Sequence, residues 1–139
     1  MNVGAHHTLL QFHEHYQRME TPSTPNVMAI YLLGKVAKDM VEYGIDTLRS
    51  DTNKKAEILY QSIEKSNSLQ AFVQNNSWQS KTTIAVEMKE LNIIVELEKQ
   101  GFMVSEGYGN YKGKQLRIGN FPATSMETIE SFARVLEQY

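Results

Sequence analysis

Apolar and polar residues alternate along the run QLRIGNF, residues 115–121. A period of two is typical of a strand with one buried face. The pattern predicts two faces, with Leu116 and Ile118 on one and Arg117, Gly119 and Phe121 on the other. An arginine held on a strand at a sheet edge can bind a carboxylate through two parallel hydrogen bonds. A surface arginine on a half-buried strand is the simpler alternative.

A helix is predicted from about Pro25 to Tyr43, with Gly44 ending it in the left-handed conformation. Its first half, Val27 to Leu33, is apolar all round, so it needs cover on more than one side. This favours a subunit interface or a further domain, with a central helix wrapped by its own domain as the alternative. At the start of the helix, Thr24 is predicted to be the N-cap and Pro25 the first helical residue. Such a start favours bound anions, often phosphate.

The rest of the chain predicts an α+β domain. A helix is expected at 51–65, with its buried face formed by Ala56, Leu59, Tyr60 and Ile63. A second helix is expected at 90–100, with its buried face formed by Leu91, Ile94 and Val95. Strands are expected at 82–88, with Ile84, Val86 and Met88 on one face, and at 102–106. The polar loop 66–80 has Leu69, Phe72, Val73 and Trp78 as expected packing anchors. A last helix is expected after Thr124, with Glu127 in capping-box register. Helices would therefore cover one face of a small, mainly antiparallel sheet, preceded by a long helix.

Composition excludes several classes of function. The formal net charge of −2 argues against broad binding to nucleic acid or anionic membranes. The absence of cysteine excludes a disulfide framework and a thiolate metal site. No apolar run reaches the roughly 18 residues that span a bilayer, and the amino terminus lacks the layout of a secretory signal. These features are compatible with a cytoplasmic protein.

Two other groups of residues were weighed as sites. The four histidines, His6, His7, His13 and His15, match no known closed metal site, so no metal is predicted. The loop GYGNYKGK, residues 107–114, lacks the strand and helix that flank a phosphate-binding loop.

The run LRIGNFP with its following helix, and the run METPSTPNVMAIYLLGKV, resemble parts of the class V, fold-type I aminotransferases that depend on pyridoxal 5′-phosphate (PLP). The phosphoserine aminotransferase branch, which acts in serine biosynthesis, is the most similar. The resemblance implies that Arg117 binds the α-carboxylate of an amino-acid or 2-oxo-acid substrate. It implies that Thr24 reaches the PLP phosphate of the other subunit of a homodimer. Ser23 stands where the family often has asparagine, which makes it a second candidate contact to the phosphate.

The resemblance covers nearly all of this chain but only the carboxy-terminal third or so of a complete enzyme. Residues 1–20 would follow a large domain, and residues 21–139 would form the small domain. No lysine precedes Lys35, which lies in the predicted helix and does not match the PLP-binding position. The chain alone is therefore not expected to transaminate. Asn110 and Tyr111 replace a His-Arg pair that commonly holds the substrate phosphate, which leaves open whether the substrate carries one.

Two alternative functions are also compatible with these sequence features. A stand-alone module that senses a small carboxylate would keep Arg117 and need no lysine. A structural dimerisation domain would use the apolar surface of the long helix. Trp78 could also stack on a cofactor ring, but a packing role is expected because in the family that stacking residue belongs to the large domain.

Overall fold

The computed structural model describes residues 8–90 and 92–139. The chain divides into two compact units, the first ending at Glu42 and the second running from Tyr43 to Tyr139. Each unit is described by itself. The division falls later in the chain than the predicted boundary after residue 20, which stays a prediction about the complete protein.

From residue 8 on, the first unit contains two helices, α1 (Leu9–Gln17) and most of α2 (Val27–Tyr43). The N-cap of α2 is Asn26, whose Oδ1 accepts a hydrogen bond from the backbone N–H of Ala29 at 3.0 Å. The prediction of Thr24 as the N-cap and Pro25 as the first helical residue was therefore wrong. Asn26 caps as well as threonine does, and it stands three residues before the amide that it satisfies.

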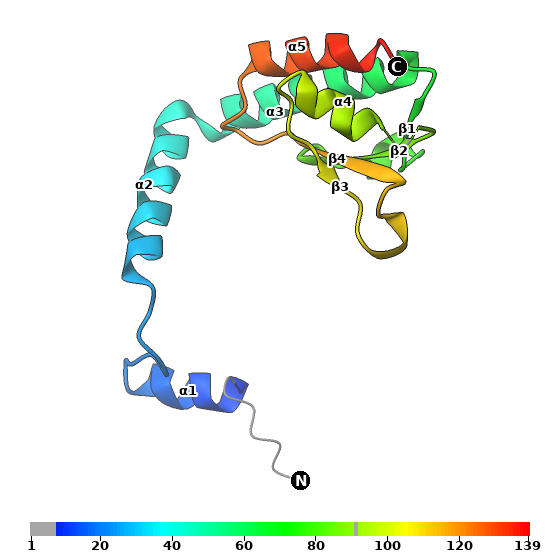
Figure 1. The fold of residues 1–139 in the computed structure, drawn as a ribbon. Helices are drawn as coiled ribbons and strands as arrows, with labels where there is room; N and C mark the ends of the chain where they lie inside the picture. Colours follow the sequence, from blue (N-terminus) through cyan, green and yellow to red (C-terminus); the bar gives the residue numbers. More distant parts are fainter. Residues whose placement is uncertain (1–7, 91) are drawn as a thin grey trace. The chain divides into compact units, whose positions relative to one another are not determined.

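The second unit holds three helices and four strands (Figure 1). Its elements are α3 (Ile45–Lys65), β1 (Leu69–Ala71), β2 (Thr83–Met88), α4 (Ile93–Lys99), β3 (Ser105–Glu106), β4 (Gln115–Gly119) and α5 (Met126–Leu136). Two single turns of 3₁₀ helix, η1 (Asn76–Trp78) and η2 (Gly109–Tyr111), lie in the loops. Among the described residues, no helix is long and apolar enough to cross a bilayer.

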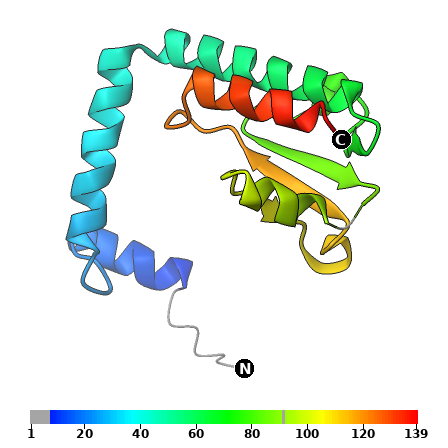
Figure 2. The same ribbon diagram turned by 45° about the horizontal axis from the view of Figure 1, so that its top comes forward.

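The four strands form one antiparallel sheet in the order β1-β2-β4-β3. Helices α3, α4 and α5 lie on one side of it (Figure 1), and Figure 2 shows α3 and α5 running side by side. The core between the helices and the sheet contains Ala56, Leu59, Ile63, Ile84, Val86, Ile93, Leu97, Leu116, Ile118, Ile129, Phe132 and Leu136. This arrangement confirms the predicted α+β fold.

The alternation predicted for residues 115–121 is confirmed within β4, which ends at Gly119. Leu116 and Ile118 are buried under the helices, so Arg117 lies on the face that α3, α4 and α5 leave open. Strand β4 is not at an edge, however, because it pairs with β2 on one side and β3 on the other. The expectation of a sheet edge was wrong because part of the segment predicted as a strand at 102–106 forms β3, which pairs with the other side of β4.

Several element boundaries differ from the predictions. Gly44 has the expected positive φ of 96°, but α3 begins directly after it rather than near Asp51. Strand β1 was not predicted, because its three residues carry no periodicity and it forms by pairing with β2. The last helix is capped by Ser125, whose Oγ accepts from the N–H of Thr128 at 3.1 Å, rather than by Thr124.

Three of the described residues that were predicted to pack are exposed, and Phe72, at 40%, is the least exposed of them. Trp78 is 77% exposed, since η1 lies at the surface and its loop is held by polar contacts such as that from Gln79 Nε2 to the carbonyl of Val73. Val95 is 50% exposed because α4 turns Ile94 and Leu97 toward the core. Leu91, also expected in the core, lies outside the described residues.

Candidate functional site

Arg117 lies in the middle of the open face of the sheet, flanked by small side chains. The strand register places it opposite Ala85 of β2 and Ser105 of β3. The ring of Phe121 lies against the backbone of Gly119, two residues after Arg117. A Cβ at residue 119 would be only 2.7 Å from Cε2 of that ring, so this position needs a glycine. The cross-strand neighbours of Arg117 are therefore small side chains.

Two contacts hold the guanidinium of Arg117. Its Nε donates a hydrogen bond to the carbonyl of Glu106 at 2.9 Å, and its Cζ lies 4.0 Å from the centre of the Tyr108 ring. No carboxylate among the described residues forms an ion pair with it. Its two terminal nitrogens thus remain available to bind a carboxylate bidentately.

The turn that follows Arg117 is tied to α3 by two buried polar side chains. Asn120 is fully buried, and its Nδ2 donates to the carbonyls of Thr52 at 3.0 Å and Lys81 at 2.8 Å. Lys55 is 3% exposed, and its Nζ donates to the carbonyls of Phe121 at 3.0 Å and Thr124 at 2.8 Å.

Burial lowers the pKa of Lys55, an effect that the charge of Asp51 partly opposes. Four backbone carbonyls are thus bound by two side chains, which fixes the end of β4. Neither residue was predicted to support the site. The signal for Lys55 was its position one helical turn before Leu59, on the face of α3 that packs into the core.

Ser23 and Thr24 are exposed and lie just before α2. Their hydroxyls make no hydrogen bond with any described residue, whereas the cap of the helix is supplied by Asn26. Two free hydroxyls beside a helix N-terminus fit a phosphate group chemically. Thr24 and Arg117 belong to different units, so each is described within its own unit.

The loop 107–114 contacts Arg117 through Tyr108, a residue that the sequence analysis missed. Asn110 and Tyr111, the two positions of interest there, are placed differently. The Tyr111 ring packs edge-on against Phe72 with ring centres 5.3 Å apart, and Asn110 is exposed. An aromatic residue between two glycines was the available signal for Tyr108, since such a loop can bring a ring close to a neighbouring strand.

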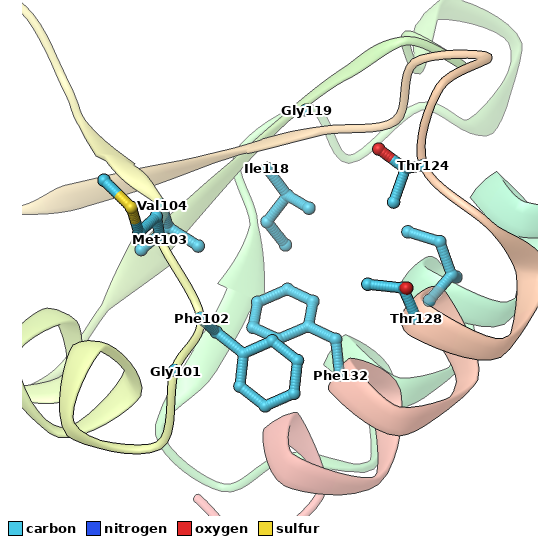
Figure 3. A pocket seen from close by; sticks show the side chains of 10 residues that line it. Gly101, Phe102, Met103, Val104, Ile118, Gly119, Thr124, Thr128 and Phe132 are labelled. Carbon is cyan, nitrogen blue, oxygen red and sulfur yellow. The ribbon is translucent and has the colours of Figure 1, made fainter.

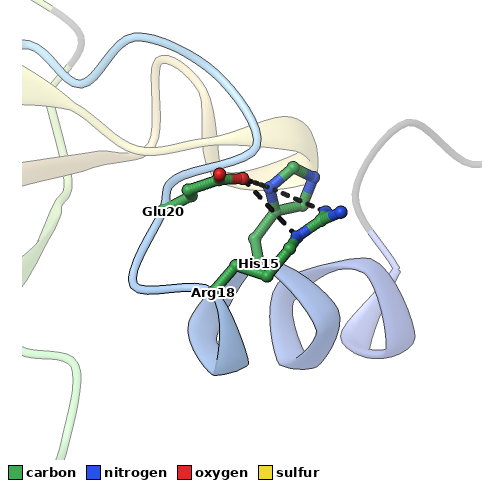
Figure 4. A network of polar contacts seen from close by, with 3 residues as sticks. All are labelled: His15, Arg18 and Glu20. Atoms are coloured by element: carbon green, nitrogen blue, oxygen red, sulfur yellow. Dashed lines mark hydrogen bonds and ion pairs between the residues drawn. The ribbon is translucent and has the colours of Figure 1, made fainter.

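The described histidines take part in local polar contacts. His13 Nε2 lies 3.0 Å from Gln17 Nε2, and His15 Nδ1 lies 3.5 Å from a carboxylate oxygen of Glu20, which also pairs with Arg18 (Figure 4). In the part of the chain that the structure describes, no three His, Asp or Glu side chains are grouped to hold a metal ion. His6 and His7 lie outside that part.

A cavity of about 200 Å³ lies on the helical side of the sheet, between the start of α5 and the segment after α4 (Figure 3). The rings of Phe102 and Phe132 line it with their centres 5.0 Å apart, and Thr124 and Thr128 are its polar residues. Ile118 points into it. Since Arg117 and Ile118 alternate along β4, the cavity and the arginine lie on opposite faces of the sheet.

Comparison with known proteins agrees with this fold. The chain belongs to the aminotransferase class-V family, whose model matches residues 4–131. It is 24% identical over 132 residues to the chloroplastic phosphoserine aminotransferase 1 of Arabidopsis thaliana, covering 91% of this chain and 31% of that protein.

Among solved structures, the chain resembles the phosphoserine aminotransferase SerC of Cytophaga hutchinsonii, with a TM-score of 0.84 and 36% identity over 99% of this chain and 38% of that one. The phosphoserine aminotransferase of Bacillus circulans subsp. alkalophilus gives a TM-score of 0.74 at 21% identity, over 93% of this chain and 37% of that one. The chain thus spans between 31% and 38% of the length of these relatives, and it shares the fold of the solved structures over nearly all of its own length.

Proposed function

We propose that this chain is the small-domain part of a PLP-dependent transaminase of the phosphoserine aminotransferase type. The whole enzyme would transfer an amino group between an amino acid and a 2-oxo acid. The family match and the likeness to phosphoserine aminotransferases support the reaction class. The observation that carries the proposal is Arg117, a guanidinium with no ion-pair partner among the described residues, held on an open sheet face by Glu106 and Tyr108.

Arg117 would bind the α-carboxylate of the substrate. A planar guanidinium matches a carboxylate through two parallel hydrogen bonds, and this geometry fixes the orientation of the bound molecule. The clamp on the end of β4, formed by Lys55 and Asn120, supports the strand that carries it. Because orientation contributes strongly to catalysis, the chain would act by placing the reacting carbon rather than by transferring a proton.

The cofactor would be held in part by Thr24 and Ser23, whose free hydroxyls can donate to its phosphate. PLP, when bound, supplies the electron-withdrawing ring on which transamination depends. The lysine that binds it covalently would come from outside this chain, since Lys35 lies within α2. A metal plays no part in this proposal.

The enzyme would be a homodimer, with the second subunit covering α2. No residue of α2 is buried in the structure, although Val27, Ile30, Leu33 and Val36 are among its exposed apolar side chains. Burial of this surface would release water from a large apolar area. A cytoplasmic location stays a prediction from the sequence, and so does the identity of the substrate's distal group, including any phosphate.

The test is a comparison of Arg117→Ala with Arg134→Ala in a full-length enzyme that carries this segment. Arg134 is an exposed arginine in the last turn of α5 and serves as the matched control. Loss of a charged hydrogen-bonded contact of roughly 1.5–3 kcal/mol predicts a rise in the KM for the amino acid of roughly 10- to 150-fold. PLP content should stay unchanged in both variants. An unchanged KM in Arg117→Ala would contradict the proposal.

If the isolated chain instead binds 2-oxoglutarate, glutamate or phosphoserine with saturable heat in calorimetry, the rival function as a carboxylate-sensing module gains support.

A further inference from the structure

The ring of Tyr108 lies against the guanidinium of Arg117. The Cζ atom is 4.0 Å from the ring centre, a distance at which a cation is attracted to the face of an aromatic ring. The other constraint on the guanidinium is the hydrogen bond from Nε to the carbonyl of Glu106. The hydrogen bond fixes the inner edge of the group and the ring limits its rotation, so together they direct the two terminal nitrogens outward.

The loop that carries Tyr108 is itself held in place. Its carbonyl accepts a hydrogen bond from the N–H of Tyr111 at 3.0 Å, and the N–H of Gly107 donates to the carbonyl of Gln115 at 2.8 Å. A Cβ at Gly107 would lie only 2.6 Å from the carbonyl oxygen of Tyr111, so the loop closes this tightly only because residue 107 is glycine. The Tyr111 ring then rests against Phe72, at the end of β1.

The exposed position of Tyr108 makes a packing role a poor explanation for this contact. The side chain is 75% exposed, and the residues that form the hydrophobic core do not include it. An arginine side chain that is free to rotate loses conformational freedom when it binds a ligand, whereas one already ordered loses less. A ring that orders Arg117 would therefore increase affinity for a carboxylate without touching it.

We propose that Tyr108 is a positioning residue of the carboxylate site, holding the guanidinium plane of Arg117 ready for a substrate carboxylate. This inference rests on the proposed function of Arg117. Its chemical requirement is an aromatic ring at residue 108, and the phenol hydroxyl is not needed. Phenylalanine should therefore replace tyrosine there, whereas leucine should not.

The first arm of the test is NMR on the 139-residue chain. In the unchanged protein the Nε–H signal of Arg117 should be shifted by the ring current of Tyr108 and protected from exchange with water. Tyr108→Phe should preserve both properties, and Tyr108→Leu should lose both while the amide spectrum of the core stays unchanged. Tyr16→Leu, at an exposed tyrosine of α1, is the matched control and should alter neither.

The second arm measures kinetics in a full-length enzyme that carries the segment. Tyr108→Leu should raise the KM for the amino acid by roughly two- to fivefold, the size expected of an exposed cation–π contact. Its kcat and PLP affinity should stay close to those of the unchanged enzyme, and Tyr108→Phe should restore the KM.

The two failures can be told apart. If Arg117→Ala raises the KM while Tyr108→Leu changes neither the KM nor the Nε–H signal, the positioning role is overturned and the proposed function stands. If Arg117→Ala leaves the KM unchanged, the proposed function falls, and the role inferred for Tyr108 falls with it.

Discussion

Helices α2 and α3 differ in burial, and the difference is the reverse of what their compositions would predict. Helix α2 is the more apolar, yet none of its residues is buried. Helix α3 carries many polar residues and still buries Ala56, Leu59, Tyr60 and Ile63 against the sheet. The difference teaches that burial depends on the neighbours an element has and not on its own hydrophobicity. An exposed apolar helix face is typical of a site that binds another protein.

The largest predicted effect sharpens this comparison within the second unit. Leu59→Ala removes a fully buried side chain from α3 and should lower the free energy of unfolding by roughly 2–5 kcal/mol. Urea denaturation measures the change. Leu33→Ala, the matched change on α2 at a side chain that is 68% exposed, should alter the same free energy by less than about 0.5 kcal/mol. Equal effects of the two changes would contradict the comparison.

A smaller loss is expected from Asn120→Ala. The change removes the donor that serves the carbonyls of Thr52 and Lys81, and leaving a buried acceptor unpaired costs about 1–3 kcal/mol. Thermal and urea unfolding should both report the loss. Asn110→Ala, at an exposed asparagine of η2, is the control and should leave stability unchanged. A stability equal to that of the unchanged protein would show that the buried amide does not anchor the turn.

Tyr60 predicts a dependence of stability on alkaline pH. Burial raises its pKa above the ordinary value of 10.0, and its hydroxyl donates to the carbonyl of Ser80 at 3.0 Å. The folded protein therefore keeps this proton to higher pH than the unfolded chain. The stabilisation is complete below about pH 10 and is lost as the pH rises through the folded pKa.

The measurement is the free energy of unfolding of the unchanged protein and of Tyr60→Phe, at neutral pH and between about pH 9 and about pH 11. At neutral pH the variant should lose about 0.5–1.5 kcal/mol, the value of one hydrogen bond. Above about pH 10 the unchanged protein should lose stability faster than the variant. The lowered pKa of Lys55 is common to both proteins, so it cancels in the difference. Parallel pH profiles would refute the role of Tyr60.

The smallest effect on folding should accompany a large effect on association. Leu33→Asp places a charge on the exposed apolar surface of α2 and should leave the second unit as stable as before. Sedimentation equilibrium should show that the unchanged chain self-associates with rising concentration, while the variant stays at 15.9 kDa. Lys38→Gln, at an exposed polar position of α2, changes the net charge by the same single unit and is the control. A chain that stays monomeric at all concentrations would count against α2 as the dimer surface.

The sequence predicted those parts of the fold whose pattern is local. Strands β2 and β4 alternate over five or more residues, and the core face of α3 repeats at helical spacing, so both were found. Strand β1 was missed because pairing with β2 creates it, and the strand predicted at 102–106 is limited to the two residues of β3 that pair with β4. The observed helix caps, Asn26 and Ser125, differ from the predicted ones. Several residues with good capping propensity are adjacent at each site, so propensity alone does not identify the cap.

The candidate site was predictable to a similar extent. Alternation placed Arg117 on the face opposite the core, and the structure confirms that placement. Tyr108, Lys55 and Asn120 were not found. Local pattern marks Lys55 as a core-facing position and Tyr108 as a ring in a tight loop, but the role of all three depends on contacts with residues elsewhere in the chain. The roles of Arg117, Thr24 and Ser23 remain predictions, since they concern molecules bound to the complete enzyme.

One pair of measurements tests the account most directly. In a full-length enzyme that carries this segment, the KM for the amino acid and the dissociation constant of PLP would be measured for Arg117→Ala and Thr24→Ala. The account predicts that Arg117→Ala raises the KM and spares PLP binding, while Thr24→Ala weakens PLP binding. If neither constant changes in either variant, or if Arg117→Ala loses PLP and keeps its KM, the proposed division of roles is contradicted.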